Sequence, residues 1–188
     1  MEIAFKALKK DLTCTMGKGV FQYQEGVWIE EDEANVSENG LHACLNVLDC
    51  FGYYSFSPEN VVYLAIADGD ISEDGYGTRI SCTRLKLIRS LTTEEIVLHA
   101  MNYINLHPEL DNSIRYVKEE RGEADNAFII VRGKNPAAQG KKGAVLGLLK
   151  EELNSRNIIG ASIFTVDGDT VEEDTYYRMD GTKAGGIL

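Results

Sequence analysis

The segment GLHACLNVLDC, residues 40–50, concentrates side chains that could bind a metal ion or act as nucleophiles. It holds one of the three histidines, His42, and two of the four cysteines, Cys44 and Cys50. In an extended segment, side chains two residues apart point to the same face, so His42 and Cys44 could hold one ion. Cys14 could reach the same place from a neighbouring loop. The residue types therefore predict a tetrahedral zinc site with four ligands: Cys14, His42, Cys44 and Cys50.

Two alternatives to this zinc site remain open. The chain lacks the CxxC pair of common zinc sites, so the cysteines could be buried thiols beside a hydrogen-bonded histidine. Cys82 could replace Cys50 as the fourth ligand, although it lies between apolar neighbours in RISCTRLKLI. Catalysis by Cys44 with His42 as its base is disfavoured, because the two are too close along one strand for transfer between their side chains.

The elements expected around these residues are short strands. Residues 2–8 alternate in polarity and predict a first strand, and residues 20–30 predict a hairpin that turns at Glu25-Gly26. Residues 60–67 and 79–88 are rich in β-branched and apolar side chains, which predicts two paired strands of one sheet. Residues 43–51 predict a short helix.

One amphipathic helix is expected over residues 93–106. Thr92 and Glu95 form a capping box, apolar side chains recur at helical spacing, and Pro108 ends the pattern. Residues 144–150 and 158–166 predict a second pair of strands.

These patterns predict a single domain over residues 1–188 of the α+β class. It would be a mainly antiparallel β-sheet with one long amphipathic helix and one short helix.

The charge is strongly asymmetric along the chain. The net charge is −11, and residues 19–78 contain no Lys or Arg but twelve acidic residues. Direct binding to nucleic acid is disfavoured, because affinity for phosphates comes from Lys and Arg. The sequence also lacks a secretory signal and an apolar run long enough for a membrane span, which predicts a cytoplasmic protein.

A basic partner protein is the natural complement of this acidic block, although acidity also simply promotes solubility. The candidate partner-binding residues are Glu30, Glu31, Asp32, Glu33, Asp68, Asp70, Glu73 and Asp74.

Several motifs together resemble a largely uncharacterised family of phage, prophage and gut-bacterial proteins that carry a Gly-Phe/Leu-His-Ala-Cys signature. The resemblance rests on the segments Leu12–Cys14, Gly19–Tyr23, Glu38–Cys44, Phe51–Tyr54, Gly140–Ala144, Val166–Gly168 and Asp174–Tyr177. This family often has a cysteine shortly before its signature, where this chain has Val36. If the family site is metallic, Cys50 must take that place here.

The resemblance implies a phage setting but no established activity. Combined with the acidic charge, it suggests an anti-CRISPR-like inhibitor, zinc-stabilised, that binds a basic defence protein such as a Cas9-type nuclease in the host cytoplasm. Two alternatives remain open. One is an enzyme with a cleft around His42, either metal-assisted or ADP-ribosyltransferase-like, and the other is a structural phage accessory protein.

Overall fold

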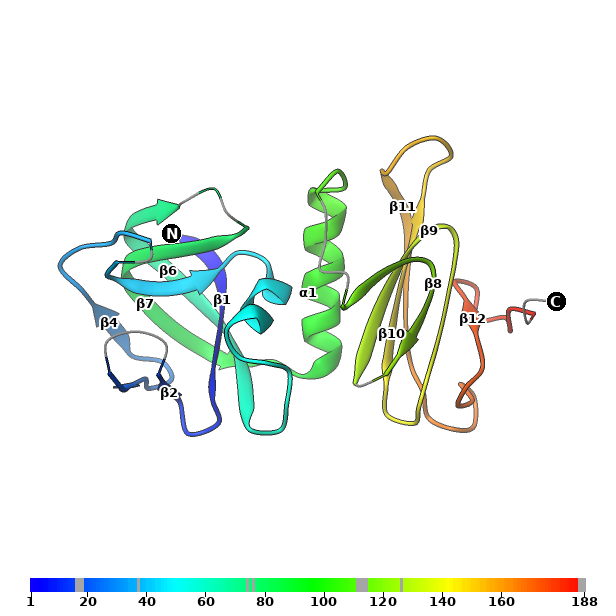
Figure 1. Ribbon diagram of the computed structural model, residues 1–188, viewed down its shortest axis with the longest axis horizontal. Helices are drawn as coiled ribbons and strands as arrows, with labels where there is room; N and C mark the ends of the chain where they lie inside the picture. Colours follow the sequence, from blue (N-terminus) through cyan, green and yellow to red (C-terminus); the bar gives the residue numbers. More distant parts are fainter. Residues whose placement is uncertain are drawn as a thin grey trace. The chain divides into compact units, whose positions relative to one another are not determined.

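The computed structural model describes residues 1–15, 19–36, 38–73, 75, 77–110, 115–125 and 127–185 (Figure 1). The chain divides into two compact units, unit 1 (Met1–Thr92) and unit 2 (Thr93–Leu188). The predicted single domain over residues 1–188 stays a prediction.

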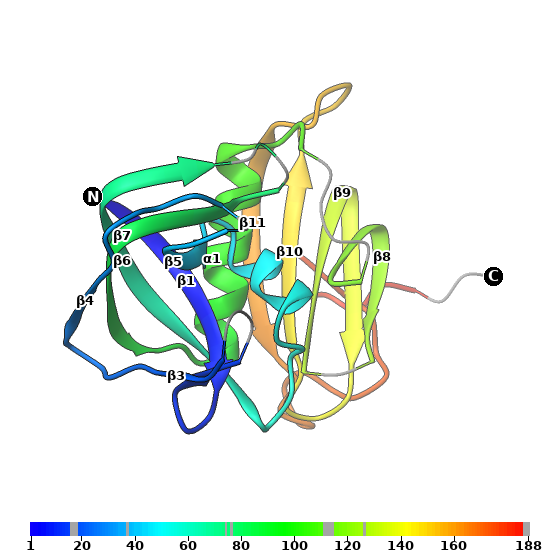
Figure 2. The same cartoon turned by 60° about the vertical axis from the view of Figure 1, so that its left-hand side comes forward.

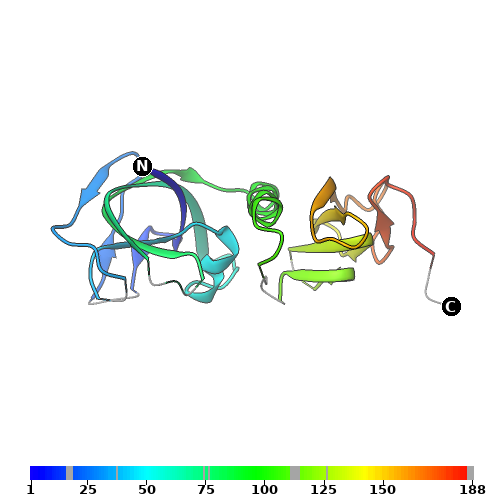
Figure 3. The ribbon, with the colours of Figure 1, turned by 90° about the horizontal axis from the view of Figure 1, so that it is seen from above.

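Unit 1 is a ring of antiparallel strands. Its elements are β1 (Glu2–Lys9), β2 (Thr13–Cys14), β3 (Phe21–Gln22), β4 (Trp28–Glu30), β5 (Leu41–Cys44), the 3-10 helix η1 (Val47–Gly52), β6 (Asn60–Glu73) and β7 (Arg79–Ser90). β1 pairs with β6, β6 with β7, β7 with β5, and β5 with β1 again, which closes the ring. Figure 3 shows these blue to green strands curving around a common centre.

The interior of the ring is apolar because alternate residues of each strand point inward. Ala4 and Leu8 of β1, Leu41 and Ala43 of β5, and Cys82 of β7 belong to one buried core cluster. The predicted pairing of residues 60–67 with residues 79–88 is confirmed by the β6–β7 ladder. The predicted hairpin over residues 20–30 is wrong, since β3 pairs with β2 and β4 pairs with β7.

Unit 2 is a sheet with one helix against it. Its elements are α1 (Thr93–Leu106), β8 (Val117–Ala124), β9 (Phe128–Gly140), β10 (Val145–Glu151), β11 (Ile158–Thr165) and β12 (Tyr177–Arg178). The sheet order is β11-β10-β9-β12, with β8 also on β9, and both β8 and β10 run parallel to β9 (Figure 2). The predicted pairing of residues 144–150 with residues 158–166 is confirmed by β10 and β11.

Close packing of α1 on β10 depends on Gly147. A Cβ atom at Gly147 would lie 2.8 Å from both Met101 Sδ and Val97 Cγ1. Both of these helix residues are buried, so the missing side chain lets the helix approach the strand.

The predicted fold class is wrong. The structure is mostly β-sheet, with 50% of residues in strands and 11% in helices, and the described residues contain two small helices rather than a long amphipathic one. α1 has the expected bounds but only 14 residues, and the short helix η1 has six. The strand content was underestimated because the charged residues 118–123 belong to β8 and the Gly/Ala/Asn/Pro-rich residues 133–140 form the second half of β9. Neither segment has the β-branched composition that marks a strand in a sequence.

Neither described helix combines the length and the apolar character that crossing a membrane requires.

Candidate functional site

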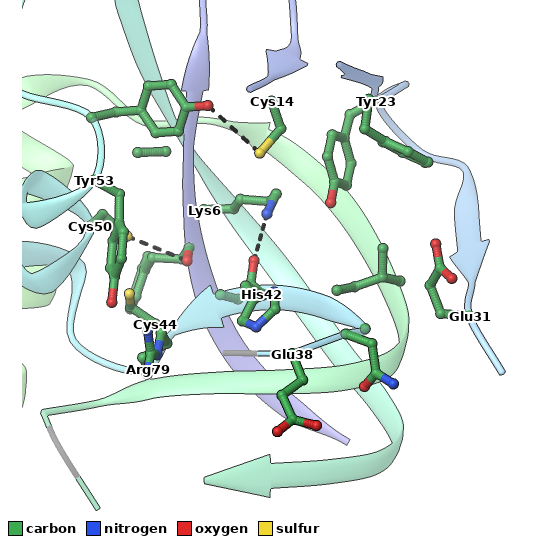
Figure 4. Close-up of a pocket in the computed structure, with 18 of the residues that line it drawn as sticks. Lys6, Cys14, Tyr23, Glu31, Glu38, His42, Cys44, Cys50, Tyr53 and Arg79 are labelled. Carbon is green, nitrogen blue, oxygen red and sulfur yellow. Dashed lines mark hydrogen bonds between the residues drawn. The ribbon is translucent and has the colours of Figure 1, made fainter. Parts of the chain in front are cut away.

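A pocket of about 520 Å³ lies in unit 1 where strands β1 and β5 separate. β1 pairs with β6 over its whole length, but its ladder with β5 consists of the single pair Phe5 and Cys44. The pocket is lined by residues 5–7 of β1 and by the Gly40–Cys44 segment that faces them. Figure 4 shows these strands with the side chains around the opening. The pocket therefore occupies the place where a longer β1–β5 ladder would have been.

Lys6 extends across this pocket. It stands between Ala4 and Leu8, at an inward position of β1, and its side chain is only 6% exposed. Its Nζ donates a hydrogen bond of 2.5 Å to the main-chain oxygen of His42 and lies 4.8 Å from the centre of the Tyr23 ring (Figure 4). The Lys6 side chain thus donates a hydrogen bond to a carbonyl of β5. In a longer ladder, a main-chain N–H of β1 would have donated to this carbonyl instead.

Burial lowers the pKa of the Lys6 amine, because removal from water disfavours the charged form. The thiols of Cys14, Cys50, Cys44 and Cys82 oppose this shift in part through their charge when ionised. Among the described residues, the groups that pair with the amine include no carboxylate. The pocket therefore holds an amine whose uncharged form is favoured relative to an ordinary lysine.

His42 lines the same pocket from β5. Burial lowers the pKa of its imidazole, and the positive charges of Lys6 and Arg79 lower it further. Burial also raises the pKa of the Tyr23 hydroxyl above its ordinary range. At neutral pH the pocket accordingly favours the neutral imidazole and the neutral phenol.

The structure brings the four predicted zinc ligands, Cys14, His42, Cys44 and Cys50, to the lining of this one pocket. Within the described ranges, however, no three His, Cys, Asp or Glu side chains are grouped closely enough to hold a metal ion. Zinc at these four residues stays a prediction, which metal analysis of the purified protein would test.

The thiols have partners within the protein. Cys50 Sγ donates to the main-chain oxygen of Phe5 at 3.4 Å, and its pKa is raised well above its ordinary value by the hydrogen bond with Cys44 and by burial. The Tyr54 hydroxyl lies 3.6 Å from Cys14 Sγ. Cys82, the alternative ligand, is fully buried and donates to the main-chain oxygen of Leu41 at 3.2 Å.

Gly40 shapes the entry to β5. Its φ of +84° lies in the left-handed region, and a Cβ atom there would be 2.4 Å from Ser81 Oγ and 2.9 Å from the main-chain oxygen of Glu33. The Ser81 hydroxyl also donates to the main-chain oxygen of Asn39 at 2.6 Å. The geometry therefore favours glycine at this position of the GLHAC segment, since a side chain would push β5 away from β7.

The predicted partner-binding residues do not share one environment. Glu30 and Asp68 meet at Arg84, with Nε to Glu30 Oε1 at 3.0 Å and Nη1 to Asp68 Oδ2 at 2.8 Å. Glu31 lines the pocket instead.

The other predicted partner-binding acids that the structure describes are exposed. Asp32 and Glu33 follow β4, and Asp70 and Glu73 belong to the distal part of β6. Asp74 lies outside the described residues.

The reasoning from the sequence missed Lys6, Tyr23 and Arg79 as pocket residues. A signal for Lys6 was present, because alternation along β1 places this lysine on the same face as Ala4 and Leu8. A charged side chain at an inward strand position is uncommon and marks a candidate functional residue. Tyr23 and Arg79 carry no comparable signal.

The fold and the site together define unit 1 as a small antiparallel ring of strands with a ligand-sized pocket in its wall. The chain belongs to the family described as a domain of unknown function, DUF7666, whose model matches residues 2–99. This match includes every residue that lines the pocket. No curated protein and no solved structure matches the chain.

Proposed function

We propose that unit 1 is a binding module for a small organic molecule whose polar head group accepts a hydrogen bond from the Lys6 amine. The observation that carries this proposal is the burial of that amine inside a pocket of about 520 Å³. Pockets of roughly 300–1,000 Å³ with apolar walls and a few converging polar groups are typical of small-molecule sites. A buried donor of this kind stabilises a bound acceptor more than an exposed lysine does.

The walls of the pocket suit a compact, partly apolar ligand. Phe21, Tyr23, Tyr53 and Tyr54 contribute aromatic surface, and Arg79 adds a second basic side chain. Glu31 and Glu38 also line the pocket, but both are exposed, whereas the donor Lys6 is buried. An oxygen acceptor, as in a carboxylate or carbonyl group, is therefore favoured over a cationic head group.

Three fragments of similar size test this proposal by ligand-observed NMR: benzoate, benzyl alcohol and benzylamine. We expect benzoate to bind most tightly and the Lys6→Met variant to weaken its binding by about tenfold, the effect of one charge-assisted hydrogen bond. Lys9→Met is the matched control, since Lys9 belongs to the same strand but is exposed. Equal binding of all three fragments, or benzoate binding that is indifferent to Lys6→Met, would overturn the proposal.

A second proposal concerns the exposed acidic side chains of unit 1. We propose that Asp32, Glu33, Asp70 and Glu73 bind a basic protein surface, in the manner of an anti-defence inhibitor of phage origin. Their exposure favours this, whereas Glu30 and Asp68 are already paired with Arg84. A zinc-stabilised inhibitor of a Cas9-type nuclease remains one version of this proposal.

The second proposal is tested by measuring binding to a purified Cas9-type nuclease at low and raised salt. Reversal of Asp70 and Glu73 to lysine is expected to abolish a salt-sensitive complex, since exposed charges act through screened attraction. Reversal of Glu2, an exposed acid outside the charged block, serves as the control. A complex that survives reversal of the block contradicts this assignment of the surface.

A further inference from the structure

The Lys6 amine combines three features that a simple hydrogen-bond donor does not need. It stands at an inward position of β1, it reaches into a pocket that small molecules can enter, and its partners among the described residues include no carboxylate that would hold it as an ammonium ion. Only the uncharged amine has the lone pair with which lysine attacks an electrophile. These features suit covalent chemistry as well as binding.

We propose that Lys6 forms a Schiff base with a small aldehyde or ketone bound in the pocket of unit 1. This inference rests on the proposed function and specifies the head group of the ligand, a carbonyl group whose oxygen is the hydrogen-bond acceptor. Formation of this Schiff base requires no metal ion. Lysines desolvated in apolar pockets are activated for this reaction in general.

The reaction balances without an oxidant or a reductant. The lone pair of Lys6 Nζ attacks the carbonyl carbon, the C=O π-electrons move to oxygen, and a proton moves from nitrogen to oxygen to give a carbinolamine. A proton from water then converts the hydroxyl to a leaving water molecule, and the nitrogen lone pair forms the C=N bond of a protonated Schiff base, which can return its N–H proton to water. Lys6 contacts His42 through the main-chain oxygen of that residue, so the protons in these steps are exchanged with water in the pocket (Figure 4).

The main-chain oxygen of His42 holds the amine in the pocket before the reaction. The bond of 2.5 Å fixes the end of a side chain that otherwise has four rotatable bonds. Attack on a carbonyl requires the lone pair to point away from this bond and toward the ligand. The parting of β1 and β5 provides that open side.

The thiols around the pocket compete for the same class of ligand. Cys14, Cys44 and Cys50 could add reversibly to an aldehyde. A hydride reagent separates the two products, because it reduces a C=N bond to a stable secondary amine and leaves no stable adduct on sulfur. Reductive trapping therefore reports on the lysine amines and not on the thiols.

The test uses the full chain, glyoxylate as the carbonyl probe and cyanoborohydride as the reductant at neutral pH, with peptide mapping by mass spectrometry. Lys6 is expected to be modified faster than the exposed Lys9, since the pocket holds the carbonyl probe against the buried amine. Benzoate, bound at the same pocket, should protect Lys6 and leave Lys9 unaffected. A Lys6→Arg variant, checked for native circular dichroism, should show only the slower background labelling.

The outcomes separate this inference from the proposed function. Benzoate binding without any modification of Lys6 would overturn the Schiff base and leave the binding module standing. Loss of both benzoate binding and Lys6 modification would overturn both. Because Lys6 and Lys9 are compared within one wild-type chain, the result does not depend on the variant folding.

Discussion

The amine of Lys6 and the main-chain oxygen of His42 are joined by a hydrogen bond of 2.5 Å at the place where β1 and β5 separate. A side chain has taken the place of a strand-to-strand bond, and the space left between the strands is the pocket. The architecture of the ring and the chemistry of the site therefore have the same origin.

Replacement of Lys6 by methionine is expected to raise the free energy of unfolding by about 1 kcal/mol. It keeps the apolar stem, and the desolvation cost of the buried amine outweighs the lost hydrogen bond to the main-chain oxygen of His42. Unfolding in urea measures the change, with Lys9→Met as the exposed control. This increase is expected if Lys6 serves ligand chemistry although it lowers the stability of the fold. A loss of more than about 2 kcal/mol in Lys6→Met would instead make the lysine a structural residue.

The stability of the protein should depend on pH through His42. Its pKa in the folded state lies below the ordinary 6.5, so the unfolded chain binds more protons at this residue as the pH falls. The stabilising contribution is complete above pH 6.5 and is lost as the pH falls from 6.5 toward the lowered value. The wild type should therefore lose stability relative to His42→Gln between about pH 7 and pH 5. Parallel pH profiles for the two proteins would contradict the burial of His42.

Gly40→Ala should destabilise unit 1 by about 2–4 kcal/mol, since it combines a left-handed backbone with a clash against Ser81. Gly26→Ala is a matched control. Gly26 has a φ of +77°, but no atom lies within 4 Å of the added Cβ, so only the backbone cost of about 1 kcal/mol remains. Thermal unfolding of both variants measures the difference. Equal losses of stability in the two variants would show that Ser81 can move away from the added Cβ at no cost in free energy.

Unit 2 depends on a buried ion pair. Arg132 is 1% exposed, and its Nε lies 2.6 Å from Glu151 Oε1, while its Nη2 donates to the main-chain oxygens of Pro108 and Arg156. Glu151→Gln leaves the buried guanidinium without its counter-ion and should cost about 3–5 kcal/mol of stability. Glu172→Gln is the control, because its pair with Lys183 is exposed and should contribute far less. Similar losses in the two variants would refute a dominant role for Arg132.

The parts of the fold that could be predicted from the sequence are those with a local signal. β6 and β7 carry runs of β-branched residues, and α1 begins after a capping box and ends before Pro108, so their positions agree with expectation. β8 and the second half of β9 lack such runs, so composition could not indicate them. The predicted α+β fold class was wrong for this reason.

The candidate site was predictable only in part. The spacing of His42 and Cys44 drew attention to β5, and all four predicted ligands line one pocket, while their binding of zinc stays a prediction. The role of Lys6 depends on the single ladder pair between β1 and β5, a tertiary feature with no local sequence signature. Arg84 likewise joins Glu30 to Asp68 across neighbouring strands, which separates these acids from the exposed ones.

The pH dependence of acetylation at Lys6 would show whether this buried amine is also reactive. Trace acetic anhydride, applied to the folded wild-type protein over a range of pH, reports how much of each lysine is both uncharged and accessible. The account predicts that Lys6 reacts faster than Lys9 at neutral pH and titrates below the ordinary lysine pKa of 10.5. An amine that stays unreactive in the folded protein, or that titrates together with Lys9, would contradict the account.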